Sequence, residues 1–137
     1  MTRVRHPFFP RLKVTPAAKA IGICAAISGS FEELLAIAQV GVRAQSAVFP
    51  VLRTTGGWLT AFERDRLWDI FLVPVYAVRI DPRGRIQAFE CEAQDGMHIT
   101  KGVPHHGELD ASICDCGRPG ARLLAGPGVA AKADAAD

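Results

Sequence analysis

The chain has 137 residues, 49% of them apolar, which suits one compact domain and is too little for two. Sixteen basic and fourteen acidic residues give a net charge of +2, so the composition favours neither a nucleic-acid partner nor an acidic tail. The apolar run at residues 17–27 is far shorter than a membrane span, and no convincing cleavage signal follows it. We therefore expect a cytoplasmic protein without a membrane partner, in a reducing compartment where clustered cysteines more often bind metal or react than form disulfides.

Three zones divide the chain. Residues 1–16 contain several Arg and Pro and no clear periodicity, so we expect an N-terminal arm with little structure of its own. Residues 17–124 carry the patterns of regular structure, and we expect them to form a single α/β zinc-binding domain. Residues 125–137 (AGPGVAAKADAAD) have almost no bulky side chain to bury, so we expect a disordered tail there.

A strand and a helix open the domain. Residues 20–27 (AIGICAAI) are apolar on both alternating faces, which predicts a strand covered on both sides, with Cys24 as a small buried residue. Ser30 is followed three residues later by Glu33, the spacing of a capping box, and an apolar stripe then continues to Gly41. The pattern predicts a helix of about three turns that ends at this glycine.

The same order then repeats. Residues 46–53 predict a second strand, which Pro50 makes an edge strand or a bulged one. Thr60 and Glu63 have the spacing of a second capping box before a second helix. We expect one face of that helix to carry Leu67, Trp68 and Phe71.

The pattern changes after this helix. Residues 73–80 and 85–91 predict two strands joined by Asp-Pro-Arg-Gly at 81–84, the residues that a type I turn prefers. A turn at 95–96 leads to a possible third strand at 97–100. The predicted fold class is therefore α/β, a small strand–helix–strand–helix layer followed by a β-hairpin or meander.

Four residues in the second half have the chemistry of a metal site. Cys91, His98, Cys114 and Cys116 form the pattern C-x6-H-x15-C-x-C. Three thiolates and one imidazole are a common closed ligand set for structural zinc, and they leave no position open for water or substrate. We therefore predict zinc as a structural cofactor that fastens the hairpin to the segment around Cys114 and Cys116.

Other interpretations of these residues stay open. His105 and His106 compete with His98 as the imidazole ligand, although they lie in a Gly/Pro-rich stretch. One alternative is that the thiols are free, and another is that Cys114 and Cys116 form a redox or nucleophilic site with His98. Glu90 and Glu92 flank Cys91 on one strand face, but a supporting or solvated role is expected for them rather than acid–base catalysis. For Arg118 and Arg122 we expect solvation or ion pairing.

Three blocks resemble the phenylacetate–CoA ligase family of adenylate-forming enzymes: TTGGWLTAFERDRLWDIFLVPVY, AFECEAQDGMHI and CDCGRPGARLL. Gly56-Gly57 correspond to that family's Gly-Gly-Glu loop, residues 73–76 to its V-P-V-Y strand, and residues 90–92 and 95–99 to its E-C-E and D-G-x-H-I segments. Residues 114–118 with Arg122 match C-x-C-G-R-x-x-x-R. The resemblance covers residues 54–124, and it implies that a Cys/His cluster of this kind holds zinc.

The departures from the family concern its catalytic parts. No Ser/Thr/Gly-rich phosphate loop with a lysine precedes these blocks, and Trp58 stands in place of the glutamate after Gly-Gly. The aromatic-Gly-x-Ser/Thr-Glu motif is lost, since residues 77–81 read AVRID. We expect neither a ribose-binding Asp between His98 and Cys114 nor the small lobe that carries the catalytic lysine. Adenylation needs neutralised phosphates and a positioned lysine, so the resemblance does not carry the activity over.

The sequence therefore predicts a non-catalytic, zinc-binding relative of the adenylate-forming core that acts as a binding or accessory module. We expect a protein partner or a homodimer, and no nucleic acid. The alternative is a subunit or fragment of a phenylacetate–CoA ligase-like enzyme that retains binding of a nucleotide or acyl ligand. Metal content and the state of the thiols distinguish the metal site from reactive cysteines.

Overall fold

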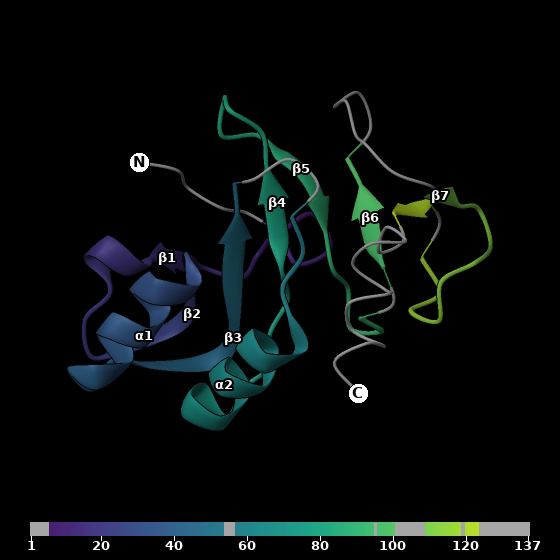
Figure 1. Ribbon diagram of the computed structural model, residues 1–137. Helices are drawn as coiled ribbons and strands as arrows, with labels where there is room; N and C mark the ends of the chain where they lie inside the picture. Colours follow the sequence, from purple (N-terminus) through teal and green to yellow (C-terminus); the bar gives the residue numbers. More distant parts are fainter. Residues whose placement is uncertain (1–5, 54–56, 95, 101–108, 119, 124–137) are drawn as a thin grey trace.

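The computed structural model describes residues 6–53, 57–94, 96–100, 109–118 and 120–123 (Figure 1). It has the predicted α/β fold, with one sheet in the order β1-β2-β3-β4-β5-β6-β8-β7. The expected tail at 125–137 lies outside the described residues. The elements are β1 (Val14–Pro16), the short 3-10 helix η1 (Ala17–Lys19), β2 (Ile23–Gly29), α1 (Phe31–Gln39), β3 (Arg43–Leu52), α2 (Ala61–Phe71), β4 (Val78–Ile80), β5 (Ile86–Phe89), β6 (Met97–Ile99), β7 (Leu109–Asp110) and β8 (Arg122–Leu123).

Both predicted helices form, and both begin with the predicted capping box. The Ser30 hydroxyl accepts the Glu33 N–H at 3.1 Å, and the Glu33 carboxylate accepts the Ser30 N–H at 2.8 Å. Thr60 and Glu63 make the same reciprocal pair at the start of α2. In the part of the chain that the structure describes, no helix is long and apolar enough to cross a membrane.

The first half of the sheet is parallel. β1 pairs with β2, β2 with β3 and β3 with β4, all in the same direction. Of the two alternatives predicted from Pro50, the edge strand is wrong, because β3 lies between β2 and β4. β3 is irregular, but its shift in register against β2 lies between Ala44 and Ala47, upstream of Pro50. The Val48 N–H donates to Pro74 O, so the nitrogen of Pro50, two residues on, faces the same neighbour. Pro50 lies between the Val48–Val75 bridge and the Val51–Val78 pair. The ladder on this side of β3 is short and already interrupted there, so the missing N–H of Pro50 is tolerated.

The second half of the sheet is antiparallel, as the predicted hairpin requires. The Gly84 N–H donates to Asp81 O at 2.9 Å and closes the turn between β4 and β5. The predicted third strand is β6, which pairs with β5. The strand predicted at 73–80 is regular only in β4, since upstream of it the chain forms just the single Val75 bridge.

Side chains on the two faces of the sheet form two cores. Leu34 of α1 and Leu67 and Phe71 of α2 pack on one face, and α1 and α2 lie side by side over it (Figure 1). Trp68 does not share this core and is 50% exposed. Neighbouring residues on a helix are turned about 100° apart, so Trp68 cannot follow Leu67 into the sheet.

The opposite face of the sheet is covered by the N-terminal segment. We expected residues 1–16 to be an arm with little structure, but Val14–Pro16 form β1 and residues 8, 9 and 12 pack against Phe49, Val78 and Phe89. His6 is fully buried, and its Nε2–H donates to Glu90 O at 2.6 Å while its Nδ1 accepts the Phe8 N–H. The segment is therefore part of the fold from His6 onward.

The His6 bond can be tested with two substitutions. His6→Phe keeps an aromatic ring but leaves Glu90 O without its donor, so the free energy of unfolding should fall by about 1–3 kcal/mol. His6→Ala also leaves a cavity and should cost more. Urea denaturation at pH 7.5 measures both, and unchanged stability of His6→Phe would show that the bond does not fasten the segment.

The wild type and His6→Phe should also differ in how their stability depends on pH. Burial lowers the pKa of His6 below its ordinary value of 6.5, so in the unfolded chain the ring takes up a proton at a higher pH than in the folded one. Stability from His6 is thus lost as the pH falls below about 6.5. The stability difference between the wild type and His6→Phe should shrink from pH 7.5 to pH 5.5, and a difference that grows would contradict the buried neutral ring.

Candidate metal centre

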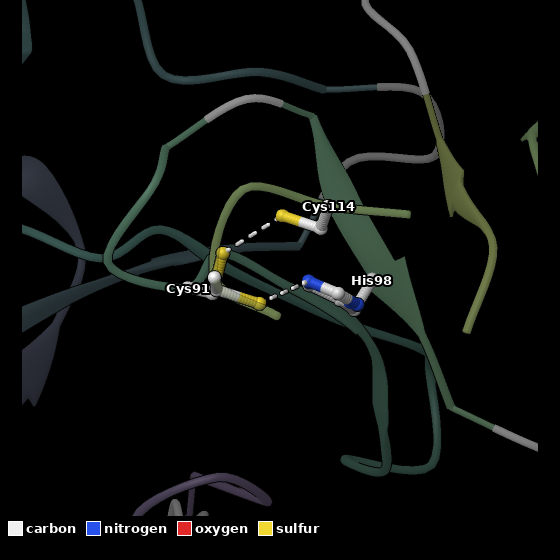
Figure 2. A group of neighbouring side chains, drawn as sticks. Cys91, His98 and Cys114 are labelled. Atoms are coloured by element: carbon white, nitrogen blue, oxygen red, sulfur yellow. Dashed lines mark hydrogen bonds between the residues drawn. The ribbon is translucent and has the colours of Figure 1, made fainter. Parts of the chain in front are cut away.

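The four predicted ligands come together at the antiparallel end of the sheet. Cys91 follows β5, His98 is the middle residue of β6, and Cys114 and Cys116 lie between β7 and β8. Their ligand atoms all lie within 4.8 Å of one another. Figure 2 shows the side chains of Cys91, His98 and Cys114 converging from separate segments.

The spacing of these atoms fits a tetrahedral metal ion. The sulfurs of Cys91 and Cys114 are 3.5 Å apart, and the sulfur of Cys116 is 3.6 Å from His98 Nε2. In a zinc site with Zn–S bonds of about 2.3 Å, the sulfurs lie about 3.8 Å apart. A disulfide needs about 2.05 Å, and all four cysteines are free thiols. The set of three thiols and one imidazole therefore could hold a metal ion, and these two distances are close to those between the ligands of a tetrahedral zinc.

Burial governs the protonation of the cluster. Burial raises the pKa of Cys91 to about 12, and the neighbouring thiols add to this. The pKa of Cys116 is lowered, because the Arg118 N–H, the two other thiols and the Arg118 side chain outweigh its desolvation. Burial, Arg122 and Arg118 lower the pKa of His98, which keeps its ring neutral at pH 7 and able to bind metal. A buried neutral thiol such as Cys91 becomes a thiolate readily only when a cation replaces its proton.

Aromatic rings hold His98 in place. The Phe89 ring stacks on it, and the Phe8 ring meets it edge-on with centroids 4.7 Å apart. Nε2 faces Cys116, while Nδ1 is buried and has no hydrogen-bond partner within the described residues. The N-terminal segment thus forms part of the wall around the candidate ligand.

The two glutamates beside Cys91 have different environments. Glu90 is buried, and its carboxylate accepts the Ala77 N–H at 2.7 Å and Arg64 at 2.6 Å. Glu92 is half-exposed and pairs with both terminal nitrogens of Arg118. The predicted ion pairing of the two arginines is confirmed, since Arg122 pairs with Asp110 at 3.0 Å. Glu90 and Glu92 are therefore occupied by structural contacts.

The remaining predicted residues lie elsewhere. Cys24 is half-buried against the helix-side core, and its thiol lies 3.6 Å from Ile21 O, outside the cluster. His105 and His106 lie outside the described residues, so the structure does not compare them with His98. Sequence reasoning missed His6 and Phe8, although a His and two Phe within four residues are an unusually apolar start for a solvated arm.

A matched pair of substitutions tests the different roles of the two glutamates. Glu90→Gln removes the counter-charge of Arg64 in a buried setting, and we expect it to lower the free energy of unfolding by about 2–4 kcal/mol. Glu92→Gln breaks an exposed pair and should cost less than about 1 kcal/mol. Denaturation of the metal-loaded proteins measures both, and equal effects would contradict the structural role of Glu90.

Comparisons with known proteins identify a fold. No family model and no curated protein sequence matches the chain. Among solved structures, it is similar to 2-hydroxyisobutyryl-CoA ligase in an open conformation with 2-HIB-AMP and CoA, with a TM-score of 0.55 and 14% sequence identity. The match covers 75% of this chain and 33% of that one, so this chain spans about a third of the ligase. The fold is therefore distantly similar to part of an adenylate-forming CoA ligase, and the assignment to the phenylacetate–CoA ligase family stays a prediction.

Proposed function

We propose that this protein is a non-catalytic relative of the adenylate-forming core, folded around a structural zinc and acting as a binding or accessory module. The observation that carries the proposal is the convergence of Cys91, His98, Cys114 and Cys116 within 4.8 Å. These residues supply four protein ligands, the number found in closed structural sites. A bound zinc would stabilise the fold and would leave no coordination position for a substrate.

The short strands of this region support a stabilising role for the proposed zinc. β6, β7 and β8 have only three, two and two residues, and strands this short form few ladder hydrogen bonds. A zinc ion would join the end of β5, β6 and the segment before β8 at one point. Since metal binding of this kind contributes directly to folding, removal of zinc should loosen this part of the sheet first.

The residues at the end of β4 support a non-catalytic role. In the adenylate-forming enzymes that the sequence resembles, a hydroxyl and a carboxylate hold phosphate and Mg²⁺ just after the V-P-V-Y strand. Here those two places are taken by Ile80, which has no hydroxyl, and by Asp81. The Asp81 carboxylate accepts the backbone N–H groups of Arg83 and Arg85 and pairs with the Arg85 guanidinium at 2.8 Å. Mg²⁺ binds oxygen ligands, and here the hydroxyl is missing while the carboxylate is already engaged by the turn.

A role in association is supported by apolar side chains that lie on the surface. Large hydrophobic residues that are mostly exposed form no part of the two cores and are candidates for contact with a partner protein or a second copy. They lie at the start of β2, after α1, at α2 and in the segment before Cys114, and they are Ile21, Ile23, Val40, Phe62, Leu72 and Ile113.

Metal analysis of the purified protein tests the zinc. We expect about one zinc per chain, slow alkylation of three thiols and fast alkylation after chelation. Cys114→Ser should abolish stoichiometric zinc, whereas Cys24→Ser, outside the cluster, should leave it unchanged. Less than one zinc per ten chains, with all thiols rapidly alkylated, would exclude the structural zinc and favour reactive thiols.

The alternative function, a subunit or fragment that still binds a nucleotide or an acyl ligand, has one observation in its favour. A cleft of about 220 Å³ lies where β2 and β3 end and α1 and α2 begin, lined by residues that include Ser30, Leu52, Arg53, Trp58 and Glu63. Ligands of α/β proteins bind at the carboxyl ends of parallel strands. Both helix starts are already capped by their own side chains, which leaves fewer free N–H groups for a phosphate.

Calorimetry against ATP, AMP, CoA and aryl acids separates the two functions. For a non-catalytic module we expect no heat and no shift in melting temperature with any of the four. Binding of one of them, weakened by Arg53→Gln but not by Arg11→Gln, would favour the alternative and place the ligand in this cleft.

A further inference from the structure

A second cleft, of about 380 Å³, lies between α2 and the turn that follows Cys91. Its lining is Arg64, Asp65, Trp68, Pro74, Val75, Tyr76, Glu92 and Gln94. This volume lies within the range of small-molecule sites. The cleft does not include the metal-cluster residues, and it is separate from the cleft at the carboxyl ends of the parallel strands.

Two donor side chains of this cleft, Arg64 and Gln94, are already engaged. Arg64 donates from one terminal nitrogen to Val75 O at 3.1 Å and from the other to Glu90 at 2.6 Å. The Gln94 side-chain nitrogen also donates to Val75 O, at 2.7 Å. The side-chain oxygen of Gln94 and the carboxylate of Asp65 accept no hydrogen bond from the described residues, so the cleft offers acceptors.

The charges of the lining also leave one negative group without a partner. The Arg64 cation is neutralised by Glu90, and Glu92 is neutralised by Arg118. Asp65 is exposed and forms no ion pair among the described residues. The lining therefore carries an excess of about one negative charge at pH 7, which attracts a cation.

An aromatic wall completes the site. Trp68 is 50% exposed on α2 and lines the cleft. The face of a tryptophan ring attracts cations, and its apolar surface packs against an alkyl chain. The Gln94 side chain lines the cleft. Its backbone φ is 53°, which is an unusual conformation for a residue with a Cβ and one that is found at binding sites.

From these contacts we propose that the cleft between α2 and residues 92–94 binds a protonated primary amine on an apolar stem. The ammonium group would lie near Asp65 and the Gln94 side-chain oxygen, and the stem would pack on Trp68. Such a group occurs both in free alkylamines and in the lysine side chain of a peptide.

The test uses the full chain with its zinc, labelled with ¹⁵N. The chain has two tryptophans, and Trp68→Phe assigns the indole N–H resonance of Trp68. n-Butylammonium should shift this resonance and the Gln94 side-chain amide, with a Kd on the order of 1–10 mM for so small a ligand. Nα-acetyl-lysine-methylamide should shift them too, while its norleucine analogue, which lacks the charge, should bind at least about tenfold more weakly.

Two matched variants localise the binding. Asp65→Asn should weaken n-butylammonium binding about fivefold or more, whereas Asp69→Asn, an exposed carboxylate of the same helix outside the cleft, should not change it. Tighter binding of n-butylammonium than of the capped lysine assigns the site to free amines, and the reverse assigns it to peptides. Equal binding of the norleucine analogue or of butyrate, equal effects of the two Asp variants, or no shift at 50 mM would overturn the proposal.

Discussion

Glu90 connects three other parts of the protein to the segment that follows β5. Its side chain accepts the Ala77 N–H and the Arg64 guanidinium, and its own N–H donates to Ala77 O. Its carbonyl accepts the His6 ring nitrogen. A buried carboxylate is costly unless every oxygen is paired, so these contacts hold β4, α2 and the N-terminal segment in fixed positions around it. Cys91, the next residue, is thereby placed at the metal cluster.

The candidate metal site and the N-terminal segment depend on the same contacts. The Phe8 ring lies against His98, and the Arg118 guanidinium lies 4.6 Å from the centre of the Phe8 ring. Arg118 in turn pairs with Glu92, the residue that follows Cys91 in the sequence. The aromatic rings pack against His98, and apolar surroundings of this kind strengthen the bonds between a cation and its ligands. The segment that covers this face of the sheet is therefore a structural part of the candidate site.

Local sequence patterns predicted most of the elements, and their failures have identifiable causes. Both capping boxes and the turn at 81–84 were found because they depend on side chains within four residues of one another. Pro50 was misplaced because its effect depends on which neighbour its nitrogen faces. Trp68 was predicted to lie on the same helix face as Leu67, but successive residues are turned about 100° around the helix axis, and Trp68 is directed away from the sheet. The packing of residues 6–16 was not predicted, because their apolar partners lie on strands much further along the chain.

By itself the sequence determined the α/β class and the four candidate ligands, because capping, turn formation and thiolate chemistry are properties of residue types at short spacings. Only the tertiary structure decided that these ligands lie within 4.8 Å of one another, that Glu90 is buried while Glu92 is not, and that His6 joins the N-terminal segment to β5. The cleft beside Trp68 also exists only in three dimensions. Each of these features requires residues separated by many positions to meet, and the local pattern carries no information on which distant strands will provide the partner.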